Sequence, residues 1–192
     1  SAASDVYKRQ VKITLTMNKR SDDVIHSFCT ECRTKSKEEM VLKAREIFSS
    51  EAQDPTHLVL SNYKRRKLNV EANEKFEGLL IEGVDTPMRL YKGLMLQGCT
   101  PSKSRGICNG ILYEVISLFP LIVKDELDEY EVTLDFCKKN FKLAYARTIF
   151  QAQSQTIHGP LQIHDVDNPI FNVRHLLTAV SRATHHSLVS IK

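Results

Sequence analysis

The spacing of hydrophobic and polar residues changes along this chain of 192 residues, and the changes mark its expected elements. Apolar residues that alternate with polar ones predict a strand over 12–18. Apolar residues at helical spacing then predict two helices, the first capped by Ser21 and the second opening with a capping box at residues 36–39. A buried strand over 57–61 and a charged helix over 62–75 follow. Strand–helix alternation with short connections predicts a parallel α/β sheet.

Between residues 78 and 138 the pattern is different, because short apolar stretches alternate with glycine and proline. These breaks fall at Gly83, Pro87, Gly93, Gly98, Pro101, Gly106, Gly110 and Pro120. Such frequent breaks predict short β-strands that close into a small barrel or sheet, rather than crossover helices.

From Phe141 the strand–helix alternation resumes. The expected elements are strands over 141–146, 161–166 and 188–191 and helices over 148–157 and 172–184. The sequence therefore predicts one α/β domain, formed by residues 11–77 and 139–192 and interrupted by a β module over 78–138. Residues 1–10, SAASDVYKRQ, have no periodic pattern and resemble a translated adapter. We expect a non-native leader there and a natural protein that extends upstream.

Composition and charge narrow the class of protein. Hydrophobic residues make up 42% and charged residues 26% of the chain, as in ordinary globular domains. No apolar run approaches the roughly 20 residues of a membrane-spanning helix, and no secretory signal opens the chain. We therefore expect a soluble, intracellular protein without a membrane partner. The net charge of +4 is compatible with binding to nucleic acid but does not require it.

The five cysteines are odd in number and irregular in spacing, which fits a reducing compartment. Cys29 and Cys32 form a single C-x-x-C pair without a second ligand pair at zinc spacing. Both lie in a predicted helix, where they can pack as small hydrophobic residues, so we expect no metal site.

Three segments place polar or charged side chains where ligands commonly bind. Arg20 follows the first predicted strand, at the carboxyl end where parallel sheets bind ligands. Thr148 follows a later strand, and the helix predicted after it is rich in amides and hydroxyls suited to phosphate and sugar contacts. Arg182 lies with His175 and Thr178 on one face of the last predicted helix. An arginine at such a position can bind phosphate through its planar guanidinium, although each segment alone also fits a solvent-exposed surface.

The order and composition of these segments resemble those of superfamily 1 helicases. Residues 15–21, LTMNKRS, match the motif L-x-x-N-x-R-S of that family. Residues 148–156, TIFQAQSQT, resemble T-[IV]-H-K-[SA]-Q-G-x-T, and residues 179–183, AVSRA, resemble A-[LV]-[ST]-R-A. Residues 62–69 resemble the N-x-x-[RV]-x-x-[IL]-N segment, and residues 93–110 resemble a G-x-x-V…N-G stretch in the inserted barrel of the RecD-like and Pif-type branch. The resemblance covers nearly the whole chain.

This resemblance implies a RecA-like α/β fold of the P-loop NTPase type. The parallel sheet would carry helices on both faces and would be interrupted by a small SH3-like β-barrel. The chain would be the C-terminal half of an ATP-dependent DNA helicase that translocates on single-stranded DNA, in processes such as DNA repair, recombination and replication. ATP and Mg²⁺ would be held mainly by an N-terminal RecA-like domain of the same protein.

The same resemblance implies roles for individual residues. Arg20 and Arg182 would reach the γ-phosphate of ATP and stabilise the charge that develops in phosphoryl transfer. Gln153, Ser154 and Thr156 would couple the nucleotide to the strand. The implied nucleic-acid contacts are Thr148, Phe150, Gln151, Asn62, Arg65 and Asn109.

The chain also departs from the family pattern. Phe150 and Gln151 replace a His-Lys pair, and Ser154 replaces a glycine. No G-x-x-x-x-G-K-[ST] motif occurs in the sequence, so we expect no ATPase activity from this chain alone. Three alternatives stay open: a non-enzymatic module that binds single-stranded nucleic acid, an RNA helicase of viral type, and a structural α/β domain without a nucleotide role.

Overall fold

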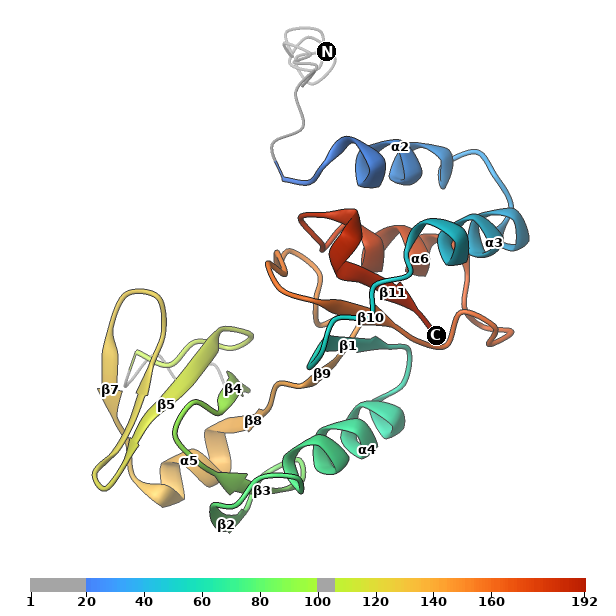
Figure 1. Cartoon of the computed structure of the whole chain (residues 1–192). Helices are drawn as coiled ribbons and strands as arrows, with labels where there is room; N and C mark the ends of the chain where they lie inside the picture. The colour runs from blue at the N-terminus through green and yellow to red at the C-terminus, as the bar shows by residue number, and fades with distance from the viewer. Residues whose placement is uncertain (1–19, 100–105) are drawn as a thin grey trace, which may run out of the picture.

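The computed structural model describes residues 20–99 and 106–192, which form a parallel sheet, an antiparallel sheet and a separate two-stranded hairpin (Figure 1). The strand predicted over 12–18 lies outside the described residues, as does most of the helicase-like motif that contains Arg20. None of the described helices is long and apolar enough to cross a membrane.

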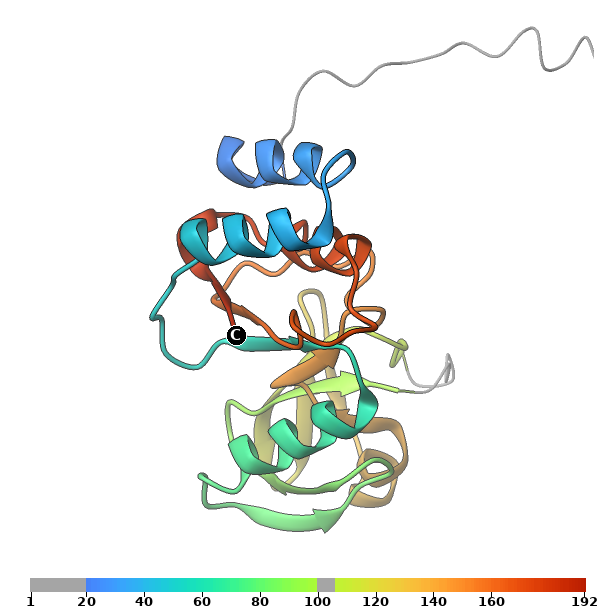
Figure 2. The same ribbon diagram turned by 90° about the vertical axis from the view of Figure 1, so that its right-hand side faces the viewer.

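The first sheet is parallel and has four strands. In spatial order these are β11 (Val189–Ile191), β10 (Leu161–Ile163), β1 (Thr56–Val59) and β9 (Ala146–Thr148). Helices α2 (Asp23–Glu31), α3 (Lys37–Ile47) and α6 (Val173–Val180) cover one face, and α4 (Asn62–Asn73) lies on the other (Figure 2). The prediction of a parallel α/β sheet with helices on both faces is confirmed.

The hydrophobic core of this sheet lies on the face of α2, α3 and α6. Their inward positions are apolar and almost fully buried, as Phe28, Met40 and Leu176 illustrate. These side chains pack against Leu58 and Ile163, which alternate along β1 and β10 with residues that face α4. Each buried side chain of this size contributes about 1.5–3 kcal/mol of transfer free energy, so this core fixes α2, α3 and α6 on the sheet.

The ends of the helices follow capping chemistry, with one correction. The capping box between Ser36 and Glu39 is present as predicted. The cap of α2 is Asp22 and not Ser21, because a carboxylate oxygen of Asp22 accepts the N–H of Ile25 at 2.9 Å. The helix predicted over 172–184 ends earlier, at Val180, where the chain enters a turn.

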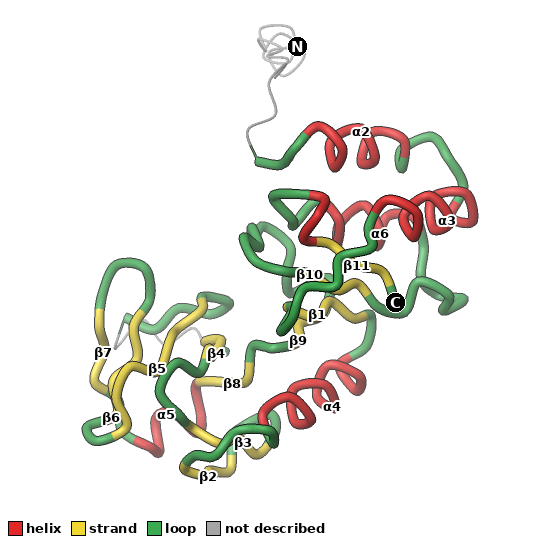
Figure 3. Tube along the Cα trace, viewed as in Figure 1, coloured by secondary structure: helices red, strands yellow, loops and turns green. Residues whose placement is uncertain are grey.

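The second sheet is antiparallel and has five strands. In spatial order these are β7 (Glu129–Glu131), β6 (Leu121–Lys124), β5 (Leu112–Leu118), β4 (Met95–Gly98) and β8 (Phe141–Leu143). The hairpin of β2 (Leu79–Glu82) and β3 (Pro87–Leu90) and the short helix α5 (Leu134–Asn140) lie beside it (Figure 3). The short strands expected between 78 and 138 are therefore present. Their closure into an SH3-like barrel stays a prediction.

The strand predicted over 141–146 is wrong as a single element. Phe141 and Leu143 belong to β8, which pairs with β4 of the antiparallel sheet. Ala146 begins β9, which pairs with β1 of the parallel sheet. Residues 143–146, LAYA, are all apolar, so the end of β8 and the start of β9 read as one apolar run in the sequence. Such a run gives no sign that the chain crosses between sheets here.

Helix α4 joins the parallel sheet to the β2–β3 hairpin through buried polar side chains. Asn69 donates to the carbonyl of Ala146 at 3.0 Å and accepts the N–H of the same residue at 2.8 Å. One turn later, Asn73 makes the same pair of hydrogen bonds with the backbone of Arg89 in β3. The helix is thereby bonded to the edge strand of the parallel sheet and to the hairpin.

A buried histidine, His164, and a half-buried one, His57, lie next to each other at neighbouring strands of the parallel sheet. His57 Nδ1 and His164 Nε2 are 3.0 Å apart, so the rings share one hydrogen bond. Burial, with the neighbouring His57 and Lys64, lowers the pKa of His164 to about 4, and burial also lowers the pKa of His57. Both imidazoles are therefore neutral in the folded protein at pH 7.

Replacing Asn69 with alanine should lower the free energy of unfolding by about 2–4 kcal/mol, because it leaves the buried N–H and C=O of Ala146 without partners. Urea unfolding of the two proteins measures the difference. The exposed Lys67 of the same helix is the control, and Lys67→Ala should stay within about 0.5 kcal/mol of the wild type. Equal effects of the two substitutions would contradict the role assigned to Asn69.

The unfolding free energy should fall as the pH falls from about 6.5 to about 4. The unfolded chain takes up a proton on His164 over this range, whereas the folded protein keeps the ring neutral because its pKa is lowered to about 4. His164→Gln should reduce this slope, and the exposed His158→Gln should leave it unchanged. Urea unfolding at pH 7 and pH 5 checks this, and a slope that survives unchanged in His164→Gln would refute it.

Candidate functional site

The carboxyl end of β9 leads into a run of tight turns and not into the helix predicted over 148–157. Ala152 N–H still bonds to the carbonyl of Thr148, four residues back. The next bonds, from Gln153 to Phe150 and from Gln155 to Ala152, span three residues and tighten the chain. Ser154 then adopts a left-handed conformation with φ 70°, which an α-helix cannot continue through.

Thr148 and Gln151 bind each other at the start of these turns. The Thr148 hydroxyl accepts the N–H of Gln151 at 3.2 Å, and the Gln151 side chain accepts the N–H of Thr148 at 3.2 Å. Phe150 points outward between them, 60% exposed, with its ring edge-on to His175 at 5.5 Å. An exposed aromatic ring held on a rigid turn is suited to stacking on a base.

Other predicted site residues also lie at the surface. Gln153, Ser154, Thr156 and Asn109 are all exposed. The first three follow one another in the turns after β9, while Asn109 precedes β5 of the second sheet. Their implied contacts with nucleotide or strand stay predictions.

Arg182 lies just after α6, and its guanidinium is half-buried. It donates to the carbonyl of Thr178 at 3.1 Å, to the carbonyl of Gln155 at 3.3 Å and to the Ser181 hydroxyl at 2.9 Å. All of these acceptors are neutral, so within the described part of the chain no ion pair neutralises its charge. The last helicase-like motif thus contacts the preceding one directly.

The structure brings Arg20 close to Arg182. Burial, together with the positive charge of Arg20, lowers the pKa of Arg182, so the two guanidiniums lie within electrostatic range. The segment between Arg20 and α2 is fixed by Asp22, whose N–H bonds to the carbonyl of Thr184 at 3.0 Å. A carboxylate oxygen of Asp22 also accepts the backbone N–H of His186 at 2.7 Å. Residues more than 160 apart in the sequence therefore meet at one place on the parallel sheet.

Among the described residues, Asp22, His185 and His186 are the group with the right side chains and spacing for a metal ion. Their possible ligand atoms lie within 4.8 Å of one another. The Asp22 carboxylate is already occupied by Ile25 and His186. We therefore interpret this group as the cap that fixes the start of α2. Burial raises the pKa of Cys29 to about 11 and that of Cys32 to about 12, which fits the packing role expected of both thiols.

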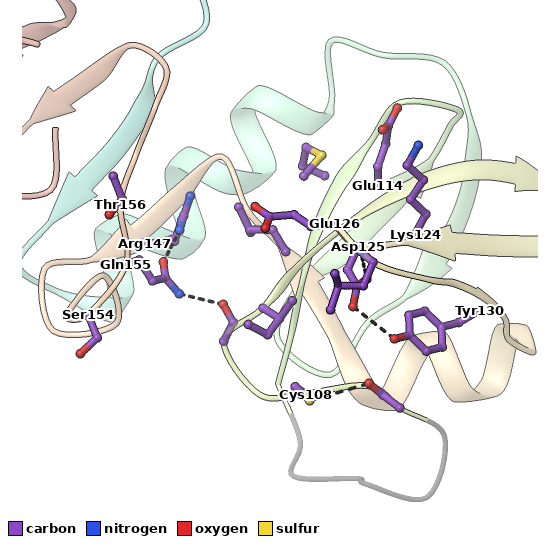
Figure 4. Close-up of a pocket in the computed structure, with 16 residues that line it drawn as sticks. Cys108, Glu114, Lys124, Asp125, Glu126, Tyr130, Arg147, Ser154, Gln155 and Thr156 are labelled. Carbon is purple, nitrogen blue, oxygen red and sulfur yellow. Dashed lines mark hydrogen bonds between the residues drawn. The ribbon is translucent and has the colours of Figure 1, made fainter. Parts of the chain in front are cut away.

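Gln155 is a site residue that sequence reasoning missed. Its carbonyl accepts from Arg182, and its side-chain oxygen accepts from Arg147. Its side-chain nitrogen donates to the carbonyl of Gly110 at 2.7 Å (Figure 4). Gln155 thus connects the region of Arg182 to the second sheet. Its position in the helicase-like motif was visible in the sequence, but nothing there indicated its partners.

A cavity of about 810 Å³ opens between the turns after β9 and the second sheet (Figure 4). Arg147, Ser154, Gln155 and Thr156 line it on the side of the parallel sheet. The second sheet contributes Met95, Ile111, Leu112, Glu114, Lys124 and Tyr130, among others. Arg147 is the one of these residues with a strongly shifted pKa, which burial lowers to about 10.

The nucleic-acid contact expected of Arg65 is corrected by the structure. Arg65 is 3% exposed, and its guanidinium bonds to both carboxylate oxygens of Asp85 at 2.6 and 2.8 Å. Its remaining donor, Nε, bonds to the side chain of Asn62 at 3.0 Å. Arg65 therefore stabilises the fold and does not face a strand, and the Asn62 side chain serves this same contact.

Replacing Ser154 with glycine should raise the free energy of unfolding by about 0.5–1 kcal/mol, because glycine adopts a φ of 70° without steric strain. Ser154→Ala is the matched control, since it also removes the hydroxyl but keeps the strain, and it should give no gain. Thermal unfolding of the three proteins tests this. A glycine variant no more stable than the alanine variant would show that no strain is stored there.

Comparisons with known proteins identify the fold. No family model matches this sequence, and no curated protein matches it. Among solved structures, the chain is similar to Bacteroides Pif1 bound to ssDNA, with 15% identity and a TM-score of 0.70 over 93% of this chain and 51% of that one. It is also similar to the Pif1 helicase from Candida albicans, with 15% identity and a TM-score of 0.65 over 95% of this chain and 56% of that one.

A structure of two coordinating Pif1 helicases at forked dsDNA is similar as well, with 15% identity and a TM-score of 0.70 over 92% of this chain and 48% of that one. The chain thus spans about half the length of the helicases that it matches. At this level of identity the likeness concerns the fold. The chain has the α/β fold of about one half of a Pif1 helicase, as the motif resemblance implied.

Proposed function

We propose that this chain is the C-terminal half of an ATP-dependent DNA helicase of the Pif type, which translocates on single-stranded DNA. The observation that carries the proposal is the contact between two helicase-like motifs, in which Arg182 donates to the carbonyl of Gln155 in the turns that follow β9. The positive charge of Arg20 also acts on Arg182. The Pif1-like fold supports it, and so does the order of the three motifs along the sequence. Solved relatives include a Pif1 helicase in complex with ADP-AlF3 and ssDNA.

The arrangement of the two arginines fits a phosphate group. Burial lowers the pKa of Arg182, and the positive charge of Arg20 lowers it further, because two guanidiniums within electrostatic range repel each other. An anion placed between them relieves that repulsion. Arg182 uses neutral acceptors to fix its orientation, which leaves its charge available for the anion.

In the proposed motor, an N-terminal RecA-like domain of the same protein makes most of the contacts with ATP and Mg²⁺. Hydrolysis of ATP transfers its γ-phosphoryl group to water. Arg20 and Arg182 stabilise the negative charge that develops on that group. Gln153, Ser154 and Thr156 lie in the turns next to Arg182 and couple the nucleotide site to the bound single-stranded DNA. The DNA itself contacts Phe150, Gln151, Thr148 and Asn109.

Arg182→Ala should reduce the DNA-stimulated ATPase rate of the protein by about 10³-fold or more. The experiment requires the protein with its upstream reading frame, recovered from the source transcript and inspected for a P-loop. Arg174→Ala is the control, because Arg174 is an exposed arginine of α6, the helix that precedes Arg182, and its loss should leave the rate unchanged. Circular dichroism of each variant verifies that it folds.

Retention of the ATPase rate in Arg182→Ala would refute the arginine-finger role. A complete transcript without a P-loop would refute the motor itself. Salt-dependent binding of single strands by that protein, independent of ATP, would then support the non-enzymatic binding module instead.

A further inference from the structure

Arg147 is a buried cation that has no counter-ion in the described part of the chain. Its side chain is 4% exposed, and its Nη1 donates to the side-chain oxygen of Gln155. Within residues 20–99 and 106–192, its Nε has no hydrogen-bond partner and no carboxylate lies within ion-pair distance of it. Although burial lowers its pKa to about 10, the guanidinium is still charged at pH 7.

The chain treats another buried arginine differently. Arg65 is equally buried, at 3% exposure, and there the fold supplies the carboxylate of Asp85 and the side chain of Asn62. An unpaired buried charge costs several kcal/mol, whereas a paired one recovers most of that cost. The structural arginine of this chain thus has its anion inside the protein, and Arg147 does not.

Arg147 lines the cavity of about 810 Å³ between β9 and the second sheet. Figure 4 shows Arg147, Gln155 and Thr156 together on one side of this cavity, with Asp125 and Tyr130 across from them. Cavities of 300–1,000 Å³ typically hold small ligands of about the size of a nucleotide. The exposed hydroxyl of Thr156 lies on the same side as Arg147 and adds a hydrogen-bonding group for a phosphate oxygen.

The opposite wall limits where an anion can lie. Glu114, Asp125 and Glu126 line the cavity from the second sheet together with Lys124, so acidic groups outnumber basic ones there and an anion is favoured at Arg147. Asp125 is already occupied by the N–H groups of Leu127 and Asp128. Apolar side chains between the two ends, from Met95, Ile111 and Leu112, are suited to contact a sugar or base.

We propose that this cavity is a phosphate-binding pocket, in which Arg147 and Thr156 hold a phosphate group of a nucleotide. The expected source is the backbone of the single strand, and this source rests on the proposed function. In the helicase-like motif a lysine is replaced by Gln151, so Arg147 supplies a cation that this segment otherwise lacks.

Two measurements test the pocket without ATPase activity. Inorganic phosphate should raise the melting temperature of the wild type more than chloride at equal ionic strength does, because binding stabilises the folded state. Arg147→Met should lose this increase and should melt higher than the wild type without phosphate, because it removes a buried charge that has no partner. Arg147→Lys keeps the charge and should keep part of the response. Arg45→Met, on the other face of the parallel sheet, should respond as the wild type does.

A lower melting temperature for Arg147→Met, with an undiminished response to phosphate, would overturn the proposal and make Arg147 a structural partner of Gln155. Failure of the phosphate response in the wild type itself would overturn it as well.

The source of the phosphate is tested with fluorescein-labelled dT20 at several salt concentrations. Arg147→Met should weaken binding about tenfold and reduce the slope of log K against log salt by about 1, whereas Arg45→Met should not. Loss of the phosphate response without any change in dT20 binding would support the pocket but assign it to a soluble phosphate compound. If the wild type binds no dT20, the proposed function fails, while the phosphate measurement still decides the pocket.

Discussion

The pair of hydrogen bonds between Asn69 and the backbone of Ala146 positions most of what we assign to function. Ala146 is the first residue of β9, an edge strand that would otherwise have an unpaired polar backbone beneath a helix. By satisfying both groups, Asn69 fixes β9 against α4 at 2.8 and 3.0 Å. Arg147 and Thr148 are the next two residues along that strand. Their directions therefore depend on a single buried amide.

Charge is handled in three different ways by three arginines of this chain. Arg65 has a carboxylate partner inside the fold, which makes it a structural element of α4. Arg182 is oriented by neutral acceptors and lies near a second arginine. Arg147 is buried with one amide partner and a free Nε. Arg65 and Arg147 are equally buried, so exposure alone does not separate a structural arginine from a ligand-binding one. The two differ in their partners, because burying a charge without an anion is costly.

The parallel sheet was predictable because each of its elements carries a local signal. The capping box at Ser36 and Glu39 and the apolar stripe of α6 are read directly from residue spacing. The break between β8 and β9 was not, since Leu143, Ala144, Tyr145 and Ala146 form one uninterrupted apolar run that spans both strands. Arg65 was expected to contact single-stranded nucleic acid, because a motif does not reveal its partners in the fold. Both of its terminal nitrogens donate to the carboxylate of Asp85, twenty residues away. The turns after Thr148 were missed for a similar reason, because the sequence there fits a helix, whereas the three-residue hydrogen bonds and the left-handed conformation of Ser154 are visible only in the structure.

Gln155 shows how the two halves of the proposed site can act on each other. Energetic coupling between sites requires a continuous set of contacts with defined geometry. Such a set runs from Arg182 to the carbonyl of Gln155, and from the Gln155 side chain to Gly110 of the second sheet. The carbonyl of Gly110 also accepts from Gln97 in β4, and Gly110 has a φ of 87°, which glycine adopts without strain. The side chain of the same glutamine accepts from Arg147 at the cavity. The arginine nearest the proposed nucleotide and the arginine of the cavity therefore share one glutamine as a hydrogen-bond partner, which is the contact through which coupling between the two would have to pass.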